Sequence, residues 1–125
     1  SISQNIGTMI MFAVRSVFSI PGRLELDINR LVQNNELPNW FIKEKNPLEF
    51  ILKDSGAKSL IDACYRYARH QEGVDTVLFG TSNLNHLNKN IKSILAPKLS
   101  AESIKKIEHY FRNLKGVGLD FPERK

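Results

Sequence analysis

The sequence of 125 residues predicts an α/β fold with two parallel strands and covering helices. Two short apolar runs, residues 8–14 and 74–79, have the β-branched and aromatic content of strands. The first run is apolar on both faces, which is typical of a strand in a parallel sheet with helices outside. Between and after the runs, apolar residues recur at helical spacing, and the predicted order of elements is β-α-α-α-β-α-α.

The composition is that of one globular domain, with 42% hydrophobic and 25% charged residues. A net charge of +5 fits a phosphorylated ligand, a nucleic acid or a solvated basic surface, and we favour the last. Basic and aromatic residues do not interleave on one face, so we expect no nucleic-acid partner. No apolar run has the length of a transmembrane helix, so we expect no membrane partner.

Cys64 is the single cysteine of the chain and lies in an amphipathic helical pattern. It is therefore expected to be a small core residue in a reducing compartment, and we expect a cytoplasmic protein. The sequence contains no zinc-ligand spacing, so we assign no metal site. It also contains no Walker sequence and no G-x-G-x-x-G string.

Three features predict the first elements of the chain: a glycine before the first strand, a turn, and apolar residues on one face of a helix. Residues 8–14 fit a buried strand or one to two turns of buried helix, and the flanking Gly7 favours the strand. Pro21 and Gly22 predict a turn. A helix over residues 23–34 follows, because four apolar residues share one helical face: Leu24, Ile28, Leu31 and Val32.

Residues 37–46 are expected to be a long loop. Its Trp40 and Phe41 either pack on the core, which we favour, or border a substrate pocket, as loops after barrel strands often do. Pro47 opens a further predicted helix that closes at residues 54–56.

Two more helices have clear starts. Ser59 is the predicted N-cap of a helix over residues 59–72, and Ser100 that of a final helix with an apolar stripe. Residues 116–125 are expected to be a flexible tail. The chain has no initiator Met and enters a buried-type strand within a few residues, so we expect it to be the back part of a longer protein.

The most informative stretch is a strand, a polar turn and a helix over residues 73–95. Asn83 is a good N-cap for this helix. Backbone N–H groups at the helix start, beside the hydroxyls of Thr81 and Ser82, form a natural anion site. Many α/β proteins have such a unit without a ligand, so the pattern alone fits an ordinary capped helix equally well.

The wording of this stretch resembles one protein family. VDTVLFGTSNLNHLNKN is similar to the last strand and following helix of aldo/keto reductases, where a V-I-P-G-T-S-N-P-E-H-L-x-x-N string holds the adenosine 2′-phosphate end of NADP(H). The preceding SLIDACYRYARHQE resembles the family's penultimate helix. The resemblance implies that residues 1–125 are the C-terminal portion of a (β/α)8 TIM barrel, an incomplete barrel with its last two strands.

The resemblance also implies a cofactor site for NADP. Residues 80–83 would form its turn, with His86 where the family has Arg or His, and with Lys89 and Asn90 toward the adenine. Asn90 matches the family's usual Asn, whereas Lys89 departs from a usual acidic or amide residue. Positions 83, 86 and 90 share one helix face. The predicted cofactor-binding residues are Phe12, Gly80, Thr81, Ser82, Asn83, His86, Lys89 and Asn90.

Phe12 enters this set through a second, shorter similarity. The family's penultimate strand often reads G-V-I-A-Y-S-P-L, with its aromatic residue against the nicotinamide, and Phe12 lies at that place in the chain. Met11 is the alternative if the register shifts by one residue, and Arg15 would contact a phosphate. The competing interpretation is that Phe12 belongs to the core and Arg15 is a charge at the rim.

The activity implied for the intact protein is NADP(H)-dependent reduction of aldehydes or ketones, with a nicotinamide cofactor and a small carbonyl substrate as partners. The family's catalytic Asp, Tyr, Lys and His precede the matched part, so no catalytic residue is assigned in this chain. The alternative is a non-catalytic fragment or pseudoenzyme that binds a nucleotide or a protein. Uncovered sheet edges also lead us to expect self-association of the fragment.

Overall fold

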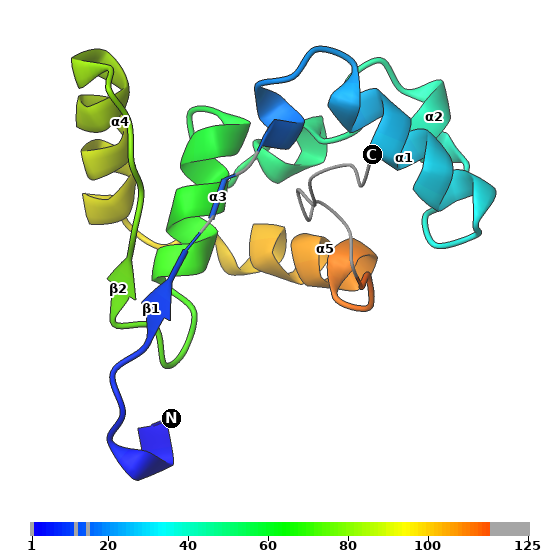
Figure 1. Cartoon of the computed structure of the whole chain (residues 1–125). Coiled ribbons are helices and arrows are strands. Elements are labelled where there is room, and N and C mark those ends of the chain that lie inside the picture. The colour runs from blue at the N-terminus through cyan, green and yellow to red at the C-terminus, as the bar shows by residue number, and fades with distance from the viewer. Residues whose placement is uncertain (1, 12, 15, 116–125) are drawn as a thin grey trace, which may run out of the picture.

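The computed structural model describes residues 2–11, 13–14 and 16–115. They form two strands, five α-helices and three 3₁₀ helices (Figure 1). In chain order these are η1 (Ile2–Gln4), β1 (Met9–Ile10), η2 (Ser16–Phe18), α1 (Arg23–Gln33), α2 (Trp40–Lys43), η3 (Glu49–Ile51), α3 (Leu60–Arg69), β2 (Thr76–Val77), α4 (Leu84–Leu95) and α5 (Ala101–Phe111).

The two strands pair in parallel, as the sequence predicted, with Met9 opposite Thr76 and Ile10 opposite Val77. The Leu78 N–H donates to the Ile10 carbonyl at 2.8 Å, and this bond closes the pairing at the carboxyl end. Each strand has two residues, so the predicted lengths were too long. A strand extends only while a neighbour supplies ladder hydrogen bonds, and a two-stranded ribbon is marginal by itself.

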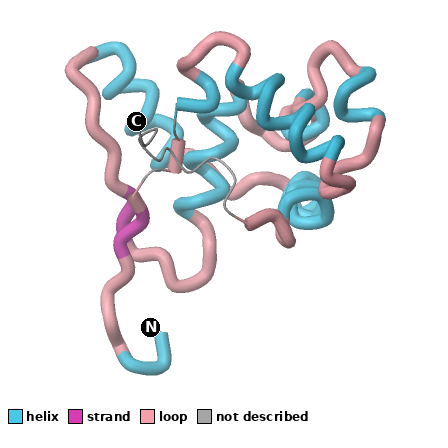
Figure 2. Tube along the Cα trace, turned by 45° about the vertical axis from the view of Figure 1, so that its right-hand side comes forward, coloured by secondary structure: helices cyan, strands magenta, loops and turns pink. Residues whose placement is uncertain are grey.

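The helices form two groups around α3. On one side of it lie α4 and the strands, and on the other lie α1 and α2, with α5 running beneath (Figure 1). The turned view in Figure 2 keeps the strands at one end and the α1–α2 pair at the other. We call the part with β1, β2 and α4 the sheet end, and the part with α1, α2 and α5 the helical end. Helix α3 connects the two, because it contacts α4 and β2 at the sheet end and its Leu60 packs against the core at the helical end.

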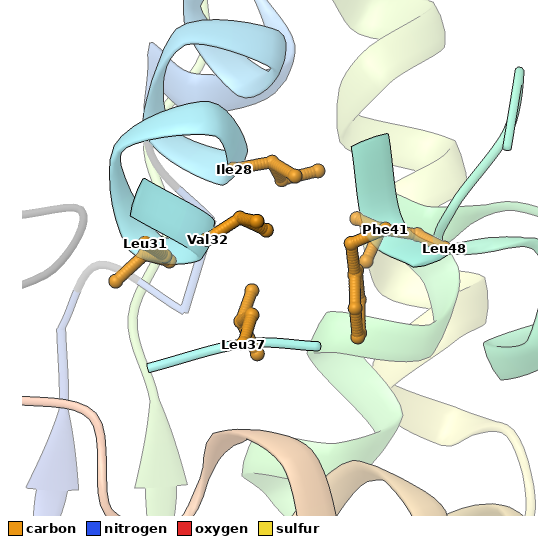
Figure 3. Close-up of a cluster of buried hydrophobic side chains, with 6 residues drawn as sticks. All are labelled: Ile28, Leu31, Val32, Leu37, Phe41 and Leu48. Atoms are coloured by element: carbon orange, nitrogen blue, oxygen red, sulfur yellow. The ribbon is translucent and has the colours of Figure 1, made fainter. Parts of the chain in front are cut away.

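The core lies at the helical end. Its six buried residues converge from α1, α2 and the loops beside them: Ile28, Leu31, Val32, Leu37, Phe41 and Leu48 (Figure 3). The Phe41 side chain is 1% exposed and packs edge-on against Tyr110 of α5, with ring centroids 5.3 Å apart. Trp40 stacks on Phe41 at 4.0 Å. These contacts confirm the prediction that Trp40 and Phe41 pack on the core.

Two predictions for the middle of the chain were wrong. The expected long loop contains the short helix α2, whose first turn is closed by a 3.1 Å bond from the Phe41 N–H to the Pro38 carbonyl. The helix expected after Pro47 is only the 3₁₀ helix η3. The backbone turns left-handed at Asp54 and Gly56, with φ of 58° and 85°, and this leaves no room for further helical turns.

Candidate functional site

The predicted site begins where β2 ends. Residues 80–83, the 80–83 turn, are exposed and lead directly into α4. Asn83 has an extended backbone, and its Oδ1 accepts hydrogen bonds from the N–H groups of Asn85 at 2.9 Å and His86 at 3.2 Å. This is the geometry of an N-cap, so the predicted helix start is confirmed.

The turn is stabilised by a second side chain. Thr81 Oγ1 accepts a hydrogen bond from the Asn83 N–H at 3.2 Å. The amides of Asn83, Asn85 and His86 are therefore already hydrogen-bonded inside the turn, and the expectation of a set of free amides there was wrong. Short polar side chains next to a helix start can accept hydrogen bonds from these amides in place of a ligand, and here Thr81 and Asn83 do so.

Other donors of the turn remain available. The Ser82 hydroxyl is exposed and makes no hydrogen bond within the part of the chain that the structure describes. The side chains of His86 and Lys89 are exposed, and Asn90 is half-buried one turn further on. The first turn of α4 contains no acidic residue. With the positive end of the helix dipole, these groups can hold an anion without a repelling carboxylate in that turn.

Nothing in the part of the chain that the structure describes requires residue 80 to be a glycine. It is not among the described residues with positive φ, and a Cβ built on it would meet no atom within 4 Å. A glycine can also serve where a ligand approaches the backbone closely. The open space above Gly80 therefore permits a ligand to lie against the turn.

The structure brings seven of the eight predicted residues together and leaves one outside. The residues of the turn and of the first two turns of α4 lie at the carboxyl end of β2. Phe12 lies outside the described residues, as does Arg15. Met11, the alternative to Phe12, is exposed directly after β1. Since the strands are parallel, Met11 and Leu78 both lie at the carboxyl end of the sheet.

Helix α3 contacts the residue directly before the turn. Tyr65 is buried on α3, and its ring meets that of Phe79 edge-on, with centroids 5.7 Å apart. Nothing in the local sequence pattern predicted this contact, because it joins a residue of α3 to the segment between β2 and α4.

A buried ion pair on α3 was also missed. Arg66 Nε donates to Asp62 Oδ1 at 3.2 Å, and the Lys58 N–H donates to Asp62 Oδ2 at 2.9 Å. Burial alone would raise the pKa of Asp62, but hydrogen bonds from Ser93 of α4 and the Lys58 amide, together with the Arg66 charge, lower it. The i, i+4 spacing of Asp62 and Arg66 was the sequence signal for this pair.

An apolar cavity of about 340 Å³ lies apart from the turn, among α1, α3 and α5. Burial in its wall raises the pKa of the Cys64 thiol to about 11, so this thiol stays protonated near neutral pH. Asp27 also lines the cavity, and Arg23 Nε donates to its Oδ2 at 3.2 Å. None of the predicted cofactor residues is among the described residues that line it.

Two other kinds of feature are absent from the described part of the chain. No group of three or more His, Cys, Asp and Glu residues there could hold a metal ion. No described helix is both long and apolar enough to cross a membrane.

Comparison with known proteins gives one match. The model of the aldo/keto reductase family matches residues 16–111, which is most of the chain. No match was found among curated proteins or among solved structures.

Proposed function

The chain belongs to the aldo/keto reductase family, and we propose that it is the C-terminal part of the family's TIM barrel and carries the adenosine-phosphate side of an NADP(H) site. The family consists of oxidoreductases that generally use NAD(P)H. The intact protein would reduce an aldehyde or ketone, with the hydride supplied by NADPH.

The surface of the sheet end supports the assignment to part of a barrel. The parallel pair β1–β2 has no third strand among the described residues, so both outer edges are unpaired. Met9 of β1 and Leu78, the residue directly after β2, are both exposed. Parallel sheets are normally covered on both faces, and neighbouring strands and helices of a barrel would cover these residues.

The observation that carries the cofactor assignment is the exposed 80–83 turn at the start of α4. Gly80 leaves space for a ligand against the backbone, and Ser82 offers an exposed hydroxyl. His86 and Lys89 add basic side chains on the first two turns of the helix. A phosphate monoester fits this combination of hydroxyl, basic groups and helix dipole better than a ribose hydroxyl does.

The preference between cofactors follows from these side chains. A charge-assisted hydrogen bond contributes about 1.5–3 kcal/mol in favourable cases. Two such contacts, reduced by solvent exposure, predict about tenfold tighter binding of NADP(H) than of NAD(H), since ~1.4 kcal/mol is a factor of ten.

The test is a pair of alanine variants in the full-length protein, Ser82→Ala and His86→Ala. Both should weaken NADPH binding more than NADH binding in a fluorescence titration. Asn88→Ala is the matched control, because Asn88 is an exposed polar residue of α4 outside the face of positions 83, 86 and 90. Equal losses for both cofactors would mean that Ser82 and His86 serve the helix start and not a phosphate.

A second measurement separates the enzyme from a binding protein. The isolated 125-residue chain should not consume NADPH with common aldehydes, because no catalytic residue is assigned in it. Steady consumption above a blank without protein would contradict this. A full-length protein that binds NADPH and never turns over carbonyl substrates would favour the non-catalytic alternative.

A further inference from the structure

The segment between β2 and α4 has few backbone anchors. The Leu78 N–H makes the last bond of the strand pair, and the next backbone bond to the turn is that of the Asn83 N–H to Thr81. Phe79 lies in this interval and is half-buried. Its ring contact with Tyr65 is therefore a side-chain interaction that restrains the chain just before Gly80.

Tyr65 is itself held firmly. It is 6% exposed and lies in the middle of α3, whose start is capped by Ser59 through a 3.1 Å bond from the Asp62 N–H. At the other end of α3, His70 Nε2 lies 3.0 Å from the Ala96 carbonyl oxygen, just after α4. Helix α3 thus contacts the chain before the 80–83 turn and also the far end of the helix after it.

We propose that Tyr65 is a positioning residue for the cofactor site, acting through Phe79 to hold the 80–83 turn in its binding geometry. The inference rests on the proposed function of that turn. Edge-to-face aromatic pairs contribute beyond their buried area. Without the Tyr65 ring, the segment before Gly80 has more conformations, and ordering it on binding lowers the affinity for the cofactor.

The test compares substitutions of two tyrosines of α3 in the full-length protein. Tyr65→Leu should weaken NADPH binding roughly threefold to tenfold, which corresponds to the strength of an aromatic pair. Tyr65→Phe keeps the ring and should bind like the wild type. Tyr67→Leu is the matched control, because Tyr67 lines the apolar cavity on the same helix and is not in ring contact with Phe79.

Two further readouts separate positioning from a loss of stability. In steady-state assays Tyr65→Leu should raise KM for NADPH and leave kcat nearly unchanged, whereas partial unfolding lowers the active fraction and hence kcat. Phe79→Leu should have the same effect as Tyr65→Leu, and the double variant should bind no more weakly than the weaker single variant. Additive losses in the double variant would overturn a role through Phe79.

The outcomes also distinguish this inference from the proposed function. If the wild type binds NADPH and loses affinity in Ser82→Ala but not in Tyr65→Leu, the turn binds cofactor and Tyr65 does not position it. If the wild type does not bind NADPH at all, the proposed function and the inference that rests on it both fail.

Discussion

The helical end and the sheet end of this molecule bury their apolar side chains to very different extents. At the helical end, α1, α2 and α5 enclose Phe41, which is 1% exposed. At the sheet end, Leu84 and Leu95 of α4 are 75% and 80% exposed. The helical end has a packed core within the chain, whereas the sheet end presents apolar side chains that the described residues do not cover.

The difference indicates where the apolar side chains of each end find the residues that they pack against. The exposed leucines lie at the two ends of α4, in the stretch whose wording most resembles the family. The stretch that resembles the family most closely therefore contains the two most exposed leucines of the described residues. This is the expected pattern if the sheet end was selected to pack against other parts of a barrel, and the following predictions test it.

The largest expected effect is that of Phe41→Ala in the 125-residue chain. Removing a fully buried ring should lower the free energy of unfolding by about 3–5 kcal/mol. Leu95→Ala at the sheet end should change it by less than about 0.5 kcal/mol, because the side chain is exposed. Urea unfolding at low protein concentration measures both. A large loss in Leu95→Ala would show that α4 is covered in solution.

The next effect concerns the ion pair on α3, between the two ends. Asp62→Asn leaves Arg66 buried without a counter-charge and should lower the free energy of unfolding by about 3 kcal/mol. Glu102→Gln is the control, since its pair with Lys106 has the same i, i+4 spacing but is exposed and should matter by less than about 1 kcal/mol.

The same pair predicts a dependence on pH. Burial acts to raise the pKa of Asp62 in the folded state, but the hydrogen bonds from Ser93 and Lys58 and the charge of Arg66 outweigh it and lower that pKa. A lowered pKa means that the carboxylate's contribution to stability is complete above the unfolded pKa and is lost as the pH falls through the folded one. Asp62→Asn should therefore flatten the acid side of the stability profile. An unchanged acid slope in that variant would contradict the role of this carboxylate.

The sequence predicted local features better than contacts between elements. The caps by Ser59, Asn83 and Ser100 are confirmed, because each depends on bonds to amides two or three residues away. The parallel pairing was also predicted, since strands apolar on both faces indicate it. The lengths of the strands were not, because they depend on neighbours that two strands alone do not supply.

The site shows the same division between local and long-range information. The turn and its N-cap Asn83 were predicted from residues 80–86, whereas the bond from the Asn83 N–H to Thr81 Oγ1 was not. The contact of Tyr65 with Phe79 joins α3 to the segment after β2, and the 3.0 Å contact of His70 Nε2 with the Ala96 carbonyl joins the ends of α3 and α4. No periodicity within either element encodes such a contact.

A smaller effect is expected on self-association of the isolated chain through its sheet end. Burying one leucine contributes about 2 kcal/mol, so Leu95→Lys should weaken association roughly 30-fold. Leu26→Lys is the matched control at the helical end, where Leu26 of α1 is 65% exposed. Sedimentation over a range of concentrations measures the effect. Equal weakening by both variants would mean that association is nonspecific and does not distinguish the two ends.

The smallest effect separates the two roles of the 80–83 turn, which is an exposed part of the sheet end. Asn83→Ala removes the acceptor for the amides of Asn85 and His86 and should lower the free energy of unfolding by about 1 kcal/mol. Asn83→Asp keeps a capping oxygen and adds a negative charge, so it should retain stability and yet weaken NADPH binding by repelling the phosphate. Asn83→Ala should also leave the amides of Asn85 and His86 free to bind an anion. This gain in NADPH binding should offset part of the affinity that is lost because the turn is less ordered. The two variants should therefore rank in opposite orders on the two measurements: Asn83→Asp should be the more stable, and Asn83→Ala should bind NADPH more tightly. If the Asn83→Asp variant were to bind NADPH as well as the wild type, the anion would not lie at the start of α4, and the cofactor assignment of the sheet end would be wrong even with its N-cap intact.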